Sequence, residues 1–231
     1  MRRLVFLFVL VLTTLFCGAA AVYAQAAPKP SLARVDVAAA VQADKSAKVT
    51  VKYAVNNPEG LKELKVMNRF ADLPGVTLEG LKATMGSANL QVASMKKAGF
   101  DEVTIQLPAD AKGKLDYTIE YTARSDRSDF RFPVLVPDFP VEKSVPSFFA
   151  TVALPPNTNF QGDEFPRIAS TEQQGGSTVL KMHEVNVPAF IRANFGQGSA
   201  PPFSETNVTT FASFLIIALA GTWWWKLKAG S

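Results

Sequence analysis

Residues 102–122 read EVTIQLPADAKGKLDYTIEYT. Apolar and polar side chains alternate in EVTIQL and again in KLDYTIEYT, on either side of a short polar linker. A strict period of two is typical of a half-buried strand, whereas a helix brings residues three or four apart onto one face. The linker 108–113 contains proline, aspartate and glycine, which favour turns. We therefore expect two strands here that form an antiparallel hairpin.

The same alternation recurs in residues 48–55, KVTVKYAV, which place Val49, Val51 and Tyr53 on one face. Weaker strands are expected at 33–41, 61–67, 76–81, 89–95, 129–136, 148–154 and 178–185. Short strands separated by glycine, proline and asparagine, with no long amphipathic helix between them, predict a mainly β protein. The specific expectation is an antiparallel β-sandwich, immunoglobulin-like in architecture, with one C-terminal transmembrane helix.

The first 24 residues are typical of a secretory signal peptide, because Arg2 and Arg3 precede an apolar stretch and a run of small residues ending at Ala24. An uncleaved membrane helix or a lipid anchor at Cys17 would be the alternatives. Cys17 is the only cysteine in the chain, so a mature protein starting at Gln25 would contain no disulfide. The exported β-sandwich domain is then expected to cover residues 25–195.

At the other end, residues 196–206 are expected to form a flexible stalk and residues 207–225 a membrane helix, because the latter carry no charge. The residues expected at the membrane interface are aromatic or basic: Trp223, Trp224, Trp225, Lys226 and Lys228. The lysines predict a cytoplasmic tail at 226–231. The expected localisation is thus single-pass in the membrane, with the main domain exported to the periplasmic or extracellular side.

Charge excludes one class of function. The sequence has 24 Lys and Arg residues, of which four (Arg2, Arg3, Lys226 and Lys228) belong to the ends; the remaining 20 equal the 20 Asp and Glu residues. A neutral body does not attract a polyanion, so we expect no nucleic acid partner.

Catalytic signals are scarce. His183 is the only histidine, and it lies in an expected strand beside Glu184, whose side chain should point to the opposite face. No nucleophile elbow, phosphate-binding glycine loop or zinc-ligand spacing is present. We therefore expect no enzyme, no catalytic residues, no metal and no cofactor.

One segment differs from the rest, because Pro133, Pro137, Pro140 and Pro146 interrupt a run of aromatic and branched residues. Proline excludes a central strand, so this is either an edge strand packed on the core or a docking surface. The candidate partner-docking residues are Phe130, Arg131, Phe132, Leu135 and Phe139. Leu135 is expected to face outward, since its neighbours share the other face of a strand in this register.

These features predict a membrane-anchored protein of the cell envelope whose exported sandwich binds or scaffolds a protein partner, as an accessory subunit of a membrane complex. Two alternatives stay open at this point. One is an envelope hydrolase that uses paired carboxylates. The other is a surface protein whose C-terminal helix is a sorting tail removed after export.

Overall fold

The computed structural model describes residues 29–69, 75–108, 113–126, 130–141, 146–198 and 211–220. Within these ranges the protein is mainly β, and its strands pair antiparallel with one exception, which confirms the predicted class. The exception is β1, which pairs parallel with β11, Val35 opposite Phe148.

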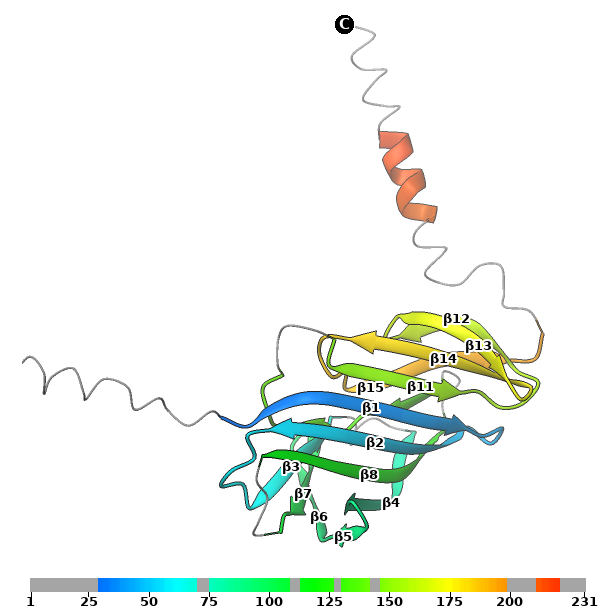
Figure 1. Cartoon of the computed structure of the whole chain (residues 1–231). Coiled ribbons are helices and arrows are strands. Elements are labelled where there is room, and N and C mark those ends of the chain that lie inside the picture. Colours follow the sequence, from blue (N-terminus) through cyan, green and yellow to red (C-terminus); the bar gives the residue numbers. More distant parts are fainter. Residues whose placement is uncertain are drawn as a thin grey trace, which may run out of the picture.

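The largest sheet has eight strands in the order β13-β14-β11-β1-β2-β8-β4-β5 (Figure 1). In chain order they are β1 (Ser31–Val41), β2 (Ser46–Asn56), β4 (Val76–Met85), β5 (Ala88–Leu90), β8 (Lys114–Ser125), β11 (Phe148–Ala153), β13 (Ile168–Gln174) and β14 (Ser177–Glu184). The longest strands, β1, β2 and β8, lie next to each other in the middle of this sheet.

Two smaller sheets complete the fold. One has the order β10-β3-β7-β6 and the other β12-β15-β9. Their strands are β3 (Glu63–Asn68), β6 (Val92–Lys97), β7 (Phe100–Gln106), β9 (Arg131–Pro133), β10 (Val136–Pro137), β12 (Asn159–Phe165) and β15 (Phe190–Gly196). Because β9 and β10 follow each other closely in the chain, the segment 131–137 joins the two small sheets.

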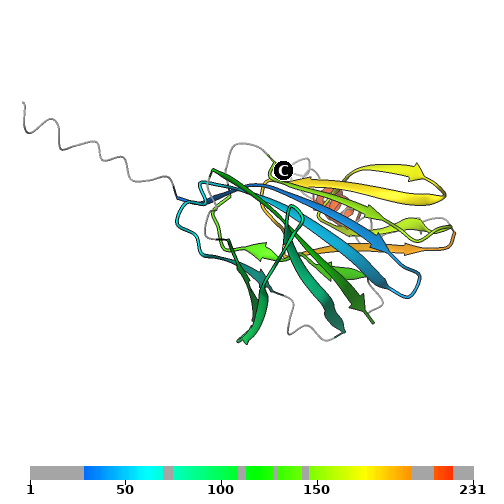
Figure 2. The same cartoon turned by 60° about the horizontal axis from the view of Figure 1, so that its bottom comes forward.

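One hydrophobic core holds the three sheets together. It includes Val51 of the large sheet, Val66 of the first small sheet and Ile191 of the second, and all three are fully buried. Figure 2 shows the small sheets on one side of the large sheet. The small sheets therefore form a second layer over the inner face of the large sheet.

Period-two alternation produces this layering. In β2, Val49, Val51 and Tyr53 are buried while Lys48 and Lys52 are exposed, as predicted. β8 alternates in the same way over its twelve residues. Each strand therefore buries one apolar face and leaves a polar face in solvent.

The predicted hairpin between 102–107 and 115–122 is wrong. Both segments are strands, β7 and β8, but β7 pairs with β3 and β6 whereas β8 pairs with β2 and β4. Both strands turn their apolar faces to the common core, so alternation alone could not distinguish two neighbours in one sheet from two strands in facing layers.

The predicted membrane span also needs correction. The helix in this region covers residues 211–220, and among the residues that the structure describes no helix is long and apolar enough to cross a membrane. A crossing needs roughly 20 residues. The single span over 207–225, and the membrane as a partner, are therefore not supported. The signal peptide 1–24, most of the stalk, Trp223, Trp224, Trp225, Lys226 and Lys228 lie outside the described residues.

Candidate functional site

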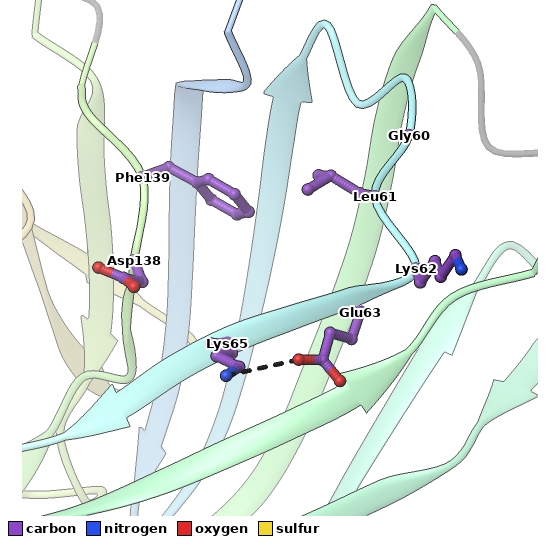
Figure 3. A pocket seen from close by; sticks show the side chains of 7 residues that line it. All are labelled: Gly60, Leu61, Lys62, Glu63, Lys65, Asp138 and Phe139. Carbon is purple, nitrogen blue, oxygen red and sulfur yellow. Dashed lines mark ion pairs between the residues drawn. The ribbon is translucent and has the colours of Figure 1, made fainter.

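A cavity of about 500 Å³ opens beside the beginning of β3. It is lined by Gly60, Leu61, Lys62, Glu63, Lys65, Asp138 and Phe139. Leu61 and Phe139 come from opposite walls and point toward each other, while Glu63 and Lys65 lie along β3 (Figure 3). The size falls in the range of ligand pockets in proteins, and the walls combine an apolar pair with charged groups.

The cavity exists because the chain after β10 leaves the edge of β3. β10 pairs Val136 with Met67 and Pro137 with Val66, and the Asp138 N–H then donates to the Lys65 carbonyl at 3.0 Å. Two residues later the Pro140 carbonyl instead accepts from the Leu32 N–H of β1, at 2.9 Å. The two chain segments diverge from Asp138 onward, and the cavity lies between them.

Antiparallel pairing determines which backbone groups face this gap. The Leu107 N–H donates to the Lys62 carbonyl, so even-numbered residues of β3 direct their polar groups to β7 and odd-numbered ones to the opposite edge. In the same register Glu63 would lie opposite Pro140, which has no N–H to donate. Within the described ranges, no backbone hydrogen bond with a turn or loop reaches Glu63. Its N–H and carbonyl therefore face the cavity.

The loop before β3 supplies the apolar wall. Gly60 has φ of +84°, a left-handed conformation that glycine adopts without a steric penalty. The Leu61 N–H donates to the Pro58 carbonyl at 3.0 Å, which closes the turn. Glu59 accepts from the Gly113 N–H at 3.0 Å, and this bond lowers the pKa of the Glu59 carboxyl. These contacts fix the loop that presents Leu61 to Phe139.

Charged side chains surround the exposed side of this edge. The Lys65 Nζ lies 3.4 Å from a Glu63 carboxylate oxygen and 3.9 Å from one of Glu102. Asp138 is exposed and comes directly after β10, whose register with β3 places it opposite Lys65. Three carboxylates therefore lie near one lysine on the outer side of the cavity.

The opposite end of the proline-rich segment is buried. Phe130, Phe132 and Leu135 have at most 3% of their surface exposed, whereas Arg131 and Phe139 are half-buried. The prediction that Leu135 faces outward is wrong, because the chain between β9 and β10 is not a continuous strand and both Val134 and Leu135 point into the core. Of the five candidate docking residues, Phe139 lines the cavity; whether the segment docks a partner stays a prediction.

Two tyrosines of the large sheet hold this buried stretch. The Tyr53 hydroxyl donates to the Leu135 carbonyl at 2.6 Å, and the Tyr121 hydroxyl donates to the Pro133 carbonyl at 2.5 Å. Tyr117 stacks on Tyr53 with ring centroids 4.7 Å apart, but its buried hydroxyl has no hydrogen-bond partner among the described residues. Burial raises the pKa of all three hydroxyls above the ordinary tyrosine value.

Sequence reasoning missed Leu61, Glu63 and Lys65. The expected strand 61–67 includes Leu61, and the turn residues Pro58 and Gly60 just before it are the signal that indicates a loop. Nothing in the sequence indicates that Pro140 falls in register with Glu63, because this depends on how residues 77 positions apart (140 minus 63) are aligned.

His183, the one titratable candidate, is exposed on β14 opposite Phe149. Together with Glu184 and Arg167 it lines a smaller cavity of about 360 Å³. In the described part of the chain, no three His, Cys, Asp or Glu side chains lie close enough to hold a metal ion.

Comparison with known proteins adds little at the level of sequence: no family model matches the chain, and no curated protein is significantly similar to it. Among solved structures, the chain is similar to an M1 zinc metallopeptidase from Deinococcus radiodurans, at 14% identity and a TM-score of 0.42, over 72% of this chain and 42% of that one. It is also similar to leukotriene A4 hydrolase from Saccharomyces cerevisiae, at 14% identity and a TM-score of 0.45, over 74% and 30%. The chain thus spans less than half the length of either structure.

The predicted function, a membrane-anchored scaffold of the cell envelope, is not retained, because no helix among the described residues is long and apolar enough to cross a membrane. Likeness to the two solved structures at this level does not assign their activity to this chain. The described residues also offer no ligand set for a zinc ion.

Proposed function

We propose that this chain is a β-sandwich module that binds an extended peptide along the open edge of β3, with an apolar side chain between Leu61 and Phe139. The observation that carries the proposal is the divergence at Pro140, which leaves the Glu63 backbone groups directed into a cavity of about 500 Å³.

Peptide ligands suit this geometry because an added strand uses the backbone groups that a sheet edge leaves unpaired. At Glu63 an incoming peptide can donate to the carbonyl and accept from the N–H, as the next strand would do. Its neighbouring side chain then points toward the inner side of the sheet, where Leu61 and Phe139 provide apolar contacts (Figure 3). Main-chain bonds would supply affinity, and this apolar pair would supply selectivity.

Binding without catalysis is part of the proposal. The described residues that line the cavity include two lysines and two carboxylates but no histidine, serine or cysteine, which are the usual nucleophiles and bases of hydrolases. Export by residues 1–24 and an immunoglobulin-like classification of the sandwich also remain proposals; the two layers over a single core support the latter. Mass spectrometry of the purified mature protein would support export if it showed a chain that begins at Gln25.

The test is a screen of short, end-blocked peptides from a positional-scanning library against the full-length protein, followed by fluorescence anisotropy of the selected sequences. The expected ligands carry one large apolar residue, and Phe139→Ala should weaken them by at least about tenfold, because a buried aromatic contact is lost. Met95→Ala is the matched control, since Met95 is an apolar residue with 58% of its surface exposed on β6, away from the cavity lining. Equal loss in both variants would contradict the proposal.

A further inference from the structure

We infer that the peptide site selects a lysine or arginine at the residue that pairs with Glu63, next to the apolar residue that enters the cavity. This inference rests on the proposed function and adds the charge of the ligand. The preference for a basic residue follows from the position of the carboxylates around the cavity.

The first step is the direction of the side chains. Leu64 and Val66 of β3 are fully buried, so Glu63 and Lys65 project from the outer face of the sheet. Residues that pair directly across two strands project from the same face. A peptide residue bonded to the Glu63 backbone would therefore place its side chain on the outer face beside the Glu63 carboxylate.

The second step is the other neighbour of that side chain. The incoming residue takes the place that Pro140 would have had if the chain had continued along β3. Two residues earlier on this track is Asp138, whose N–H bonds to Lys65. Side chains two residues apart on one strand share a face, so Asp138 flanks the incoming side chain from the second side.

The third step is the local charge. Glu63, Glu102 and Asp138 carry three negative charges, and Lys65 carries one positive charge that is shared between Glu63 and Glu102 at 3.4 and 3.9 Å. In the part of the chain described, no lysine or arginine lies within ion-pair distance of Asp138. In Figure 3 the Lys62 side chain lies at the far side of the loop from Asp138. A basic side chain would therefore meet two carboxylates, Glu63 and Asp138, whereas an acidic side chain would be repelled by both.

The expected ligand therefore carries an apolar residue and, next to it, a basic residue. Opposite charges directly across two strands are favourable and like charges are unfavourable by similar amounts. The expected discrimination between lysine and glutamate at this one position is about fivefold, and it should shrink as salt screens the exposed carboxylates.

The experiment compares two peptides that differ only in lysine or glutamate at the residue beside the apolar anchor, bound to the full-length protein at low and at high ionic strength. The wild type should prefer the lysine peptide. Glu63→Lys should abolish or invert this preference without removing the dependence on Phe139. Glu120→Lys is the matched control, because it makes the same change in net charge on the exposed face of β8 in the large sheet.

The outcomes separate the two claims. Peptides that bind in a Phe139-dependent way with no charge preference, or with a preference that Glu120→Lys alters as much as Glu63→Lys, overturn the inference and leave the proposed function in place. If no peptide binds in a Phe139-dependent way, the proposed function fails and the inference fails with it.

Discussion

The stretches 130–137 and 138–140 follow each other in the chain but are held in opposite ways. In the first stretch, tyrosine hydroxyls from the large sheet bond to the Pro133 and Leu135 carbonyls, and the side chains fill the core. In the second, the chain leaves β3, bonds to β1 through Pro140 and exposes Asp138. The first stretch builds the fold and the second opens a site, which shows that one proline-rich segment can serve both purposes.

Two prolines of this segment, Pro137 and Pro140, also differ in their effect on the neighbouring strand β3. Pro137 lies opposite Val66, whose backbone groups face β7, so its missing N–H removes no bond from the pair. Pro140 would lie opposite Glu63, whose groups face the gap. The position of a proline relative to the alternation of the neighbouring strand therefore decides whether it is neutral or leaves an edge open.

The largest expected effect is on the buried stretch. Leu135→Asp should destabilise the protein by at least about 4 kcal/mol, because it places a carboxylate in the core where Leu135 has 0% exposure. Leu135→Met is the control and should cost less than about 1.5 kcal/mol. Urea denaturation followed by circular dichroism measures both. A folded Leu135→Asp variant of nearly normal stability would break the distinction between the two stretches.

Alkaline pH should loosen the tyrosine contacts next. Burial raises the pKa of Tyr53, Tyr117 and Tyr121, so the folded protein keeps protons that the unfolded chain loses above the ordinary tyrosine pKa of about 10. The stabilisation is fully present below that pH and is lost as the pH rises further. With three tyrosines, the free energy of unfolding should fall by up to about 4 kcal/mol per pH unit.

Urea midpoints measured across the tyrosine titration, with tyrosinate absorbance as the second signal, would check this dependence. Tyr117→Phe should reduce the slope by about one third, since one of three coupled protons is removed. A midpoint that stays constant through the titration would contradict the tight burial of the three hydroxyls.

A smaller effect separates tyrosines that bond from the one that does not. Tyr53→Phe should cost about 1–3 kcal/mol, because it leaves the Leu135 carbonyl buried without its donor. Tyr117→Phe removes a buried hydroxyl that has no partner and should be neutral or stabilising. Equal destabilisation by the two variants in chemical denaturation would show that hydrogen bonding does not distinguish them.

The smallest effect tests the open end. Pro140→Ala supplies an N–H opposite Glu63 and should weaken peptide binding by about two- to tenfold, the value of one competing hydrogen bond. Pro137→Ala supplies an N–H that points away from β3 and should leave affinity unchanged. Anisotropy titrations with the selected peptide would compare them, and tighter binding to Pro140→Ala would argue against the proline as the cause of the gap.

Much of the large sheet could be predicted from the sequence. The strands that contain residues 48–55 and 115–121 alternate strictly, and the structure buries the expected faces. β12, β13 and β15 were missed. β13, with the sequence IASTEQQ, is an edge strand with little buried surface, so it lacks the apolar alternation that identifies a strand. β12 contains register shifts around Gly162 that interrupt the period.

The candidate site was predicted only in part. Phe139 was singled out because aromatic residues interleave with prolines, and it does line the cavity. The outward orientation assigned to Leu135 failed because it assumed a single uninterrupted strand. The membrane helix is predicted from an uncharged apolar stretch followed by tryptophans and lysines, whereas the described helix covers residues 211–220 and is too short to cross a membrane. Composition predicts what a segment can tolerate, but tertiary pairing decides which groups are left open.

The parallel pairing of β1 with β11 has a consequence for how the chain is made. Val35 of β1 pairs with Phe148 of β11, which lies 113 residues later in the chain (148 minus 35), and the centre of the large sheet is complete only once they pair. Contacts this distant in sequence slow folding, because a large loop must close before they form. During synthesis β1 would therefore present a bare edge until β11 emerges from the ribosome. We expect truncations that end before residue 148 to aggregate, a risk that a chaperone binding to exposed strand edges would reduce.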